Sequence, residues 1–438
     1  MNENAPPLPI SWHVARWGDE EFSRGSWSYL RPGGSPADRW TLAEPVDERL
    51  ALCGEAIGTD QAAMTHGAYA SGVRAAEWTA SVAARGERIV VVGAGFAGLG
   101  AASRLTDAGF ECVLIEARDR LGGRAHTVML DGVRGEPPVG ADAGAAWLQQ
   151  FARNPFADVV RSLGVQPVPT DFHAALAGSA DGHVGAVPEA LEALRIAALA
   201  LTGDPASPDV GLDVIAASLH LDSRAANVLA RAVEADVVLE TGAALSDTSA
   251  RWFFAEDGVG NDDHWIPGGY RQVVDHLAVG LDVRLATPVR AIDWSNAPGS
   301  AKVAITTDGG ILTADRCIAS LPISLLQRGE PVLRPGLPER HLRALRGIGM
   351  GVVEKVLMRF EQRWWPASMS GYMRWYDSPT SWCEWADLTD GCGAPVVVAL
   401  IASDSVARHH HGRTDEAVVA GATEALRRWS AAVSATQR

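Results

Sequence analysis

The sequence predicts an α/β protein in which one domain is built on a parallel sheet and a second domain is mixed α+β. Residues 88–92 (RIVVV) are apolar and β-branched, as in a strand that is buried on both faces. A turn and helix are expected over 93–107, and residues 111–116 (ECVLIE) read as a second buried strand. This order is a βαβ unit, so we expect a Rossmann-like domain.

Length and composition are those of a globular protein with two or three folding units. The chain has 438 residues, of which 47% are apolar and 21% are charged. Its net charge of −15 argues against nucleic acid or an anionic membrane as a partner. The first residues lack the basic and apolar regions of a signal peptide, and the five cysteines lack metal-ligand spacing. We therefore expect a cytoplasmic protein without a metal site.

The rest of the chain predicts two discontinuous domains. Helical Ala/Leu periodicity lies within 151–264, and strands return after it, followed by a last helix at about 414–433. We assign the Rossmann-like domain the segments 1–150, 265–320 and 401–438, the last as a closing helix. We assign the second domain the helical segment 151–264 and the sheet-forming segment 321–400.

The turn after the first strand has the glycine spacing of a dinucleotide-binding loop. Gly93, Gly95 and Gly98 suit a tight turn, a close backbone approach to a pyrophosphate and close helix–strand packing. Glu116 ends the second strand, where a carboxylate can accept a hydrogen bond from a ribose hydroxyl. Because the motif stands between a strand and a helix, a purely structural glycine turn is a poor explanation.

The segment after Glu116 (ARDRLGGR, residues 117–124) distinguishes FAD from NAD. It adds a second glycine turn and an arginine close to the first loop. The combined pattern resembles flavoproteins that include flavin-containing amine oxidases, protoporphyrinogen oxidases and carotenoid desaturases. The resemblance implies FAD as the cofactor, with Arg124 in contact with it. Further contacts implied here are Ala97, Ala117, Arg118 and Gly123.

The beginning of the chain resembles the segment with which amine oxidases end. WGDE (17–20) leads to RGSWSY (24–29), then LCGEA (52–56), and then THGAYASGVRAA (65–76). We infer a circular permutation, in which the old C-terminal segment 11–85 is fused to the βαβ unit 86–150. The cofactor contacts that the resemblance implies in this segment are Gly54, Glu55, Ala63, Met64, Thr65 and Ala68. Ser26 stands where covalent-flavin members have cysteine, so non-covalent FAD is expected.

Two further stretches extend the resemblance. AGAAW (143–147) is similar to a stretch of polyamine oxidases, which adds Ala146 and Trp147 to the implied cofactor contacts. TPV (287–289) is similar to the strand that contacts the adenine, with Val289 contributing its backbone.

Lys355 is the first candidate catalytic residue. Only two of the 38 basic residues are lysine, which suggests that Lys355 stands where arginine cannot substitute. Amine oxidases resemble this stretch, and the resemblance implies a lysine that reaches flavin N5 through water. An exposed position on a strand is the alternative, because Glu354 and Lys355 point to opposite faces.

Three more residues are candidates for the substrate side of the site. Trp27 replaces the tyrosine of the family's aromatic cage, and Met64 maps near the partner position of that cage. Gln149 stands where polyamine oxidases often have His or Glu. A plain core position for Trp27 is an equal alternative.

The resemblance implies an oxidase of a small amine or L-amino acid. The substrate carbon next to nitrogen would give a hydride to flavin N5, and O2 would reoxidise the flavin. The products would be an imine, then an aldehyde or keto acid, with NH3 and H2O2. An amino-acid monooxygenase that forms an amide is a close alternative, and a non-catalytic FAD-binding scaffold is a more distant one. The sequence leaves the oligomeric state open.

Overall fold

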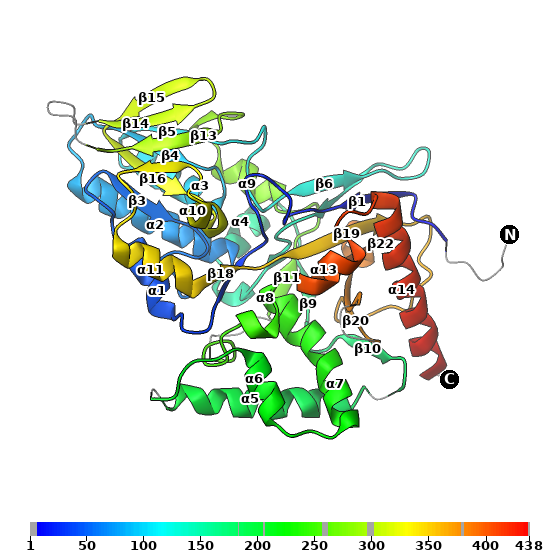
Figure 1. Ribbon diagram of the computed structural model, residues 1–438. Coiled ribbons are helices and arrows are strands. Elements are labelled where there is room, and N and C mark those ends of the chain that lie inside the picture. Colours follow the sequence, from blue (N-terminus) through cyan, green and yellow to red (C-terminus); the bar gives the residue numbers. More distant parts are fainter. Residues whose placement is uncertain are drawn as a thin grey trace. The chain divides into compact units, whose positions relative to one another are not determined.

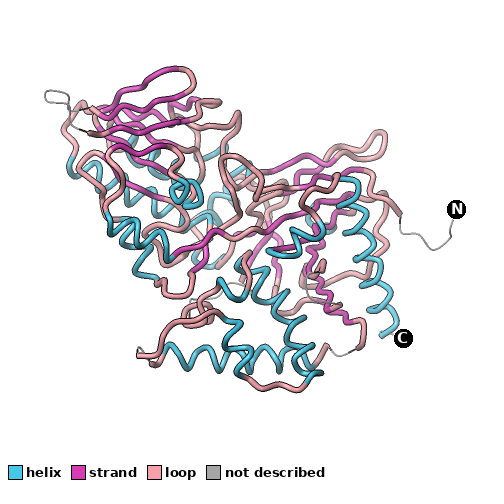
Figure 2. Tube along the Cα trace, viewed as in Figure 1, coloured by secondary structure: helices cyan, strands magenta, loops and turns pink. Residues whose placement is uncertain are grey.

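The computed structural model describes residues 7–182, 184–204, 206–255, 262–295, 302–377 and 381–436. These residues form two compact units, each assembled from separate segments of the chain (Figures 1 and 2). The α/β unit comprises Asp19–Ala125 and Arg271–Met350. The sheet–helix unit comprises Met1–Gly18, His126–Tyr270 and Gly351–Arg438.

A five-stranded sheet forms the centre of the α/β unit, and all of its strand pairs are parallel. The side chains of Ile89–Val92 in its middle strand are buried, as the apolar run predicts. The strands, in spatial order, are β12 (Asp282–Arg284), β5 (Glu111–Ile115), β4 (Arg88–Val92), β16 (Arg316–Ser320) and β3 (Leu50–Cys53). The predicted βαβ unit is confirmed, with α3 (Phe96–Asp107) between β4 and β5.

The beginning of the chain completes this sheet. Strand β3 pairs with β16, and the following helix α2 (Thr65–Val82) packs against α3. A methyl group on Gly72 of α2 would lie 1.8 Å from the carbonyl oxygen of Ala97, so the two helices approach through glycine. Residues on both sides of β4 in the sequence therefore build one layered unit.

Smaller elements complete the α/β unit. A second sheet has the order β15 (Gly310–Ala314), β14 (Val303–Thr307), β13 (Val289–Asp293) and β17 (Val332–Arg334), and β2 (Ser28–Leu30) pairs with β18 (Ile348–Met350). The remaining helices are α1 (Pro36–Ala43), α9 (Arg271–Leu277), α10 (Ile323–Arg328) and α11 (Glu339–Gly347).

A six-stranded mixed sheet organises the sheet–helix unit. Its order is β1 (Ser11–Val14), β19 (Val353–Arg359), β22 (Val396–Ala402), β21 (Glu384–Asp387), β20 (Tyr372–Tyr376) and β10 (Leu176–Ser179). Only the β10–β20 pair is parallel among these strands as described. The unit has two smaller sheets. One has the order β8 (Trp147–Leu148), β11 (Asp263–Trp265) and β9 (Val168–Thr170), and the other is the hairpin of β6 (Thr127–Leu130) with β7 (Val139–Asp142).

One face of the six-stranded sheet packs against α14 (Asp415–Thr436), drawn in red in Figure 1. Val356 and Met358 of β19 and Trp385 of β21 share a core with Leu426 and Trp429 of α14. Strand residues of the other parity, including Lys355, point to the opposite face.

Helices fill the segment between β10 and β11. They are α5 (Ala186–Thr202), α6 (Leu212–Ser218), α7 (Ser223–Val233), the π-helix η2 (Glu234–Val238), α8 (Leu239–Thr241) and the 3-10 turn η3 (Leu245–Asp247). Elsewhere in the unit are η1 (Phe151–Arg153), α4 (Phe156–Ser162), α12 (Thr389–Cys392) and α13 (Ser403–His409). Among the described helices, none combines the length and the apolar character that crossing a bilayer requires.

The division of the chain differs from the predicted domain boundaries in five places. Residues 401–438, expected in the Rossmann-like domain, belong to the sheet–helix unit because α14 buries its apolar side chains on the six-stranded sheet. Residues 321–350 belong to the α/β unit, where β18 pairs with β2. Residues 7–18, 126–150 and 265–270, all expected in the Rossmann-like domain, lie in the sheet–helix unit.

The contact between α2 and α3 yields a stability prediction. Gly72→Ala would force its new methyl group into the Ala97 carbonyl, so we expect the free energy of unfolding to fall by about 1–3 kcal/mol. Gly336→Ala is the control in the same unit, since a methyl group there meets nothing within 4 Å; it should change stability by less than about 0.5 kcal/mol. Urea unfolding followed by tryptophan fluorescence measures both, and equal effects would contradict the packing argument.

Candidate functional site

The loop between β4 and α3 has the geometry of a dinucleotide-binding turn. Gly93 has a φ of +95°, and a side chain there would collide with the Ser320 carbonyl at 2.4 Å. A methyl group on Gly98 would lie 1.7 Å from the Gly93 carbonyl, so this position also excludes a side chain. Gly95 differs, because a methyl group there would meet nothing closer than 4.0 Å. Gly95 thus leaves open space in front of the start of α3, where helix amides can receive an anion.

Glu116 follows β5 directly and faces this loop. Its Oε2 accepts a hydrogen bond from the Ala94 amide at 2.7 Å, and its Oε1 accepts one from the Arg118 amide at 3.0 Å. The residue is 3% exposed, so its carboxylate is fixed by the backbone of both neighbouring turns. Its remaining lone pairs can accept from a ligand hydroxyl.

The second glycine turn contacts the first one directly. The Gly122 amide donates to the Ala94 carbonyl at 2.9 Å, and Gly122 forms a bridge with Gly95. Gly122 and Gly123 have φ values of +93° and +59°, which favour glycine. The two predicted loops are therefore one structure in the α/β unit.

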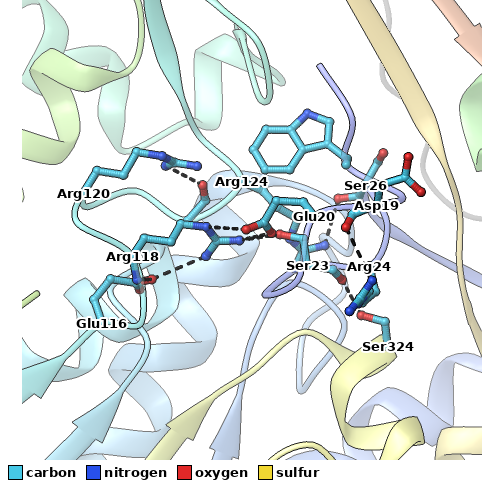
Figure 3. A network of polar contacts seen from close by, with 12 residues as sticks. Asp19, Glu20, Ser23, Arg24, Ser26, Glu116, Arg118, Arg120, Arg124 and Ser324 are labelled. Carbon is cyan, nitrogen blue, oxygen red and sulfur yellow. Dashed lines mark hydrogen bonds and ion pairs between the residues drawn. The ribbon is translucent and has the colours of Figure 1, made fainter. Parts of the chain in front are cut away.

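The arginines that follow Glu116 hold the N-terminal segment of the same unit (Figure 3). Arg118 pairs with Glu20 and donates to the Ser23 hydroxyl at 2.8 Å. Arg124 donates to the Ser26 carbonyl at 2.8 Å and to Glu55 at 3.1 Å. The segment that contains residues 20–28 is thereby tied to the glycine turns by buried and partly buried polar contacts.

Glu55 is a second buried carboxylate in this unit. It accepts hydrogen bonds from the Ser28 hydroxyl at 2.7 Å and the Ala63 amide at 3.2 Å, besides its pair with Arg124. Burial alone would raise its pKa, but the charges of Arg124 and Arg39 and the Ser28 hydroxyl outweigh burial and hold the pKa below its usual value. Glu55 is therefore charged and fixed in place.

The other predicted cofactor residues of the α/β unit lie on its helix starts, turns and second sheet. Ala63 has a φ of +63°, and Met64 is the N-cap residue of α2. Thr65 and Ala68 follow in the first turns of α2, and Gly54 directly follows β3. Ala97 lies in the first turn of α3, Ala117 follows Glu116, Val289 begins β13, and Trp27 precedes β2 half-buried.

These residues fit a dinucleotide. The parallel sheet, the open space at Gly95, the helix start and the acidic residue at the end of β5 are the features that dinucleotide sites share. Glu116, Arg124, Glu55 and the glycine turns would hold the cofactor.

Lys355 lies on β19 of the sheet–helix unit and is 5% exposed, so the alternative of an exposed strand lysine is wrong. Its Nζ donates to the Gly144 carbonyl at 2.6 Å and lies 4.7 Å from the centre of the Trp147 ring. Burial lowers the pKa of Lys355, and the charge of Asp142 opposes this effect. Asp142 is itself fixed by the Thr127 hydroxyl at 2.5 Å and the Tyr270 amide at 3.1 Å.

Of the other predicted residues in this unit, Ala146 precedes Trp147, the first residue of β8, and Gln149 follows β8. Ala146 is buried, and Trp147 contacts the ammonium group. Gln149 is half-buried, and its backbone carbonyl accepts from the side-chain amide of Asn154 at 2.9 Å. Trp147 and Lys355 are thus brought together, whereas Gln149 is engaged through its backbone.

Strand register places Lys355 in a polar row across the six-stranded sheet. Lys355 pairs with Leu400, Leu400 pairs with Glu384, and Glu384 pairs with Arg374. Directly paired residues of antiparallel strands share a face, so these side chains lie on the face opposite the α14 core.

Arg374 is the centre of a buried charge cluster on this face. Its Nε donates to Glu384 at 3.0 Å, and a terminal nitrogen pairs with Asp236 of the π-helix η2. Its guanidinium lies 3.9 Å from the centre of the Phe172 ring. Burial raises the pKa of Glu384 to about 7, against the charge of Arg374.

Aromatic rings connect the Arg374 cluster with Lys355. Trp147 stacks on Tyr372 with ring centres 5.6 Å apart, and Tyr372 meets the edge of Phe172 at 5.6 Å. Together with the contacts above, the chain of neighbours runs from Lys355 through three rings to Arg374.

Sequence reasoning missed this cluster. The signal it could have used is a single charged residue inside a strand of aromatic and apolar residues, as Arg374 is in YMRWY (372–376). The position of Asp236 has no such signal, because it depends on the π turn of η2, a departure from α-helix that often marks functional sites.

Comparison with known proteins identifies relatives of the chain. A family model described as flavin containing amine oxidoreductase matches residues 4–78 and 96–437. Polyamine oxidase 2 of Arabidopsis thaliana is 28% identical over an alignment of 317 residues that covers 64% of this chain and 60% of that protein. Human lysine-specific histone demethylase 2 is 26% identical over an alignment of 304 residues that covers 65% of this chain and 36% of the demethylase.

A solved structure has the same fold. A redesigned putrescine oxidase superposes with a TM-score of 0.58 over 77% of this chain and 82% of that chain, at 20% sequence identity. Because the family model matches most of the chain, the protein belongs to the flavin-containing amine oxidoreductases, and its cofactor is FAD.

Proposed function

We propose that the protein is an FAD-dependent oxidase of a small amine. FAD supplies a hydride acceptor at N5 and, once reduced, a donor to O2. For a primary amine, the balanced reaction is amine, O2 and water to aldehyde, NH3 and H2O2, with an imine released for hydrolysis.

The observation that carries this proposal is the polar face of the six-stranded sheet. Lys355, Glu384 and Arg374 share that face, and Asp236 faces Arg374 from η2. Isolated charges inside strands are costly unless they are paired or used, and this row has both a lysine whose pKa burial lowers and a carboxyl group, Glu384, whose pKa burial raises. We propose that this face binds the substrate.

The charges of this face favour an amine over an amino acid. A substrate carboxylate needs a cationic partner, but Arg374 is already paired with both Glu384 and Asp236. The aromatic rings of Trp147, Tyr372 and Phe172 suit a cationic or neutral amine instead.

Lys355 has the properties of a group that holds a water molecule or helps oxygen react. Its side chain is buried and fixed by Gly144 and Trp147, so its ammonium group is oriented. Its lowered pKa allows it to hold or release a proton at neutral pH.

The contacts at the two ends of the chain support the proposed circular permutation. Strand β3, from the first part of the sequence, pairs with β16 in the parallel sheet that also contains β4, and helix α2 packs against α3 of the same unit. Strand β1 contacts α14, and Arg16 pairs with Asp415 at 2.6 Å.

The five cysteines are free thiols, which supports the proposed cytoplasmic location.

A substrate panel tests the function. With primary amines, diamines and L-amino acids, we expect peroxide release with amines and much less with amino acids. Lys355→Met should keep its FAD but lose turnover by at least about 100-fold, as expected for a group that assists the reaction. Lys302→Met is the matched control, because the Lys302 side chain is 56% exposed and pairs with Asp315 at 3.9 Å in the α/β unit.

Four outcomes would contradict parts of this proposal. Turnover of amino acids but not of amines would contradict the argument that Arg374 is not available to a substrate carboxylate. An amide product would indicate a monooxygenase. Reducible FAD without turnover of any compound in the panel would favour a scaffold. Unchanged half-reactions in Lys355→Met would remove the proposed role of that lysine.

The buried carboxyl groups predict a pH dependence of stability. Burial and the charge of Glu384 raise the pKa of Glu240 to about 8. Between about pH 5 and 8, the folded protein therefore keeps a proton that the unfolded chain has lost, and the free energy of unfolding falls as the pH rises. Glu240→Gln should flatten this decline, whereas exposed Glu416→Gln should not. Urea unfolding at three pH values measures the slopes, and identical slopes for all three proteins would contradict the assignment.

Ser26 predicts non-covalent FAD. It lies buried beside Arg124 and is no partner for the thioether link that cysteine forms. After acid precipitation, we expect the flavin in the supernatant, with the absorbance of free FAD. Flavin that sediments with the protein would show a covalent bond elsewhere.

A further inference from the structure

The Arg118 guanidinium is shared between two carboxylates of the α/β unit, Glu20 and Glu116 (Figure 3). Its Nε donates to Glu20 at 3.2 Å and one terminal nitrogen also pairs with Glu20, so that pair is bidentate. The other terminal nitrogen lies 3.4 Å from Glu116, at the long end of hydrogen bonding.

We propose that Glu20 is a positioning residue of the cofactor site, which draws the Arg118 guanidinium away from Glu116 and so keeps the Glu116 carboxylate available to the ribose of FAD. The proposal rests on the cofactor role proposed for Glu116.

The acceptor capacity of Glu116 supports the need for such a competitor. A carboxylate offers about four lone-pair sites. Two are taken by the amides of Ala94 and Arg118. If the Arg118 guanidinium made a bidentate pair with Glu116, the remaining lone-pair sites would be filled. The side chain of Glu116 is only 4% exposed and therefore cannot turn toward solvent to free a site.

The position of Glu20 is fixed by the segment that contains it. Its carbonyl accepts from the amides of Ser23 and Arg24 at 3.2 and 2.9 Å, which closes a turn. The Ser23 hydroxyl accepts from Arg118, and the Ser23 carbonyl accepts from the Ser324 hydroxyl of α10 at 2.5 Å. The turn therefore holds Glu20 against Arg118 from two sides.

Glu21 provides a matched control. It is the next residue and also pairs with an arginine, Arg290, at 3.4 Å. That pair is half exposed on both sides and does not involve Glu116. Glu20→Gln and Glu21→Gln remove the same charge from adjacent positions.

The first measurement is FAD affinity. The full chain, stripped of flavin, is titrated with FAD while flavin fluorescence is followed. We expect Glu20→Gln to raise the dissociation constant about tenfold, because a partly buried charge-assisted pair is lost. Glu21→Gln should bind as the wild type does, and Glu20→Asp, which keeps the charge, should recover most of the affinity.

The second measurement separates positioning from a general structural role. ADP and 2′,3′-dideoxy-ADP compete with FAD, and only ADP offers the ribose hydroxyls. We expect the Glu20→Gln penalty to appear with ADP and to vanish with the dideoxy analogue. Equal penalties for both compounds, or no loss of FAD affinity, would overturn the proposal.

Two further arms keep the result decisive. If Glu20→Gln does not fold, Ser23→Ala removes an Arg118 acceptor without changing charge, and the same ADP comparison decides. If the wild type binds FAD and oxidises amines, and the Glu20 variants bind FAD as the wild type does, the role of Glu20 is rejected and the proposed function stays intact. Failure of the wild type to take up FAD would reject both.

Discussion

The parallel pairing of β3 with β16 is the contact on which the α/β unit depends. It makes residues near the start of the chain an edge of the sheet whose centre is β4. From that edge, α2 returns across α3, and the glycine at position 72 permits the close approach. The same geometry brings Glu55 to Arg124, and the preceding segment brings Glu20 to Arg118. Without this strand pair, the glycine turns would lack the side chains that orient their arginines.

The sequence predicted the parts of this unit that local chemistry determines. The apolar run at β4, the glycines of the turn and the acidic end of β5 each have a local reason, and the structure has all three in place. Domain boundaries were predicted less well because long-range packing decides them. Helix α14 is amphipathic in any context, and only its burial against β19 and β22 assigns it to the sheet–helix unit.

The candidate site was predicted unevenly for the same reason. Lys355 was found because lysine is rare in this chain, and its burial agrees with the expectation. Arg374 was one of many arginines, and nothing in its neighbours along the chain marks its partner Asp236. That pair depends on strand register and on a π turn, neither of which has a local sequence signature. The functional roles of these residues remain predictions for experiment.

The contrast between the two lysines has a practical consequence for chemical labelling. Lys302 offers an exposed ε-amine, whereas that of Lys355 is buried and hydrogen-bonded. Amine-directed reagents such as succinimidyl esters should therefore modify one side chain and the α-amino group. A fluorophore, surface tether or cross-linker could thus be attached at a single defined side chain of the natural sequence, without engineering a cysteine.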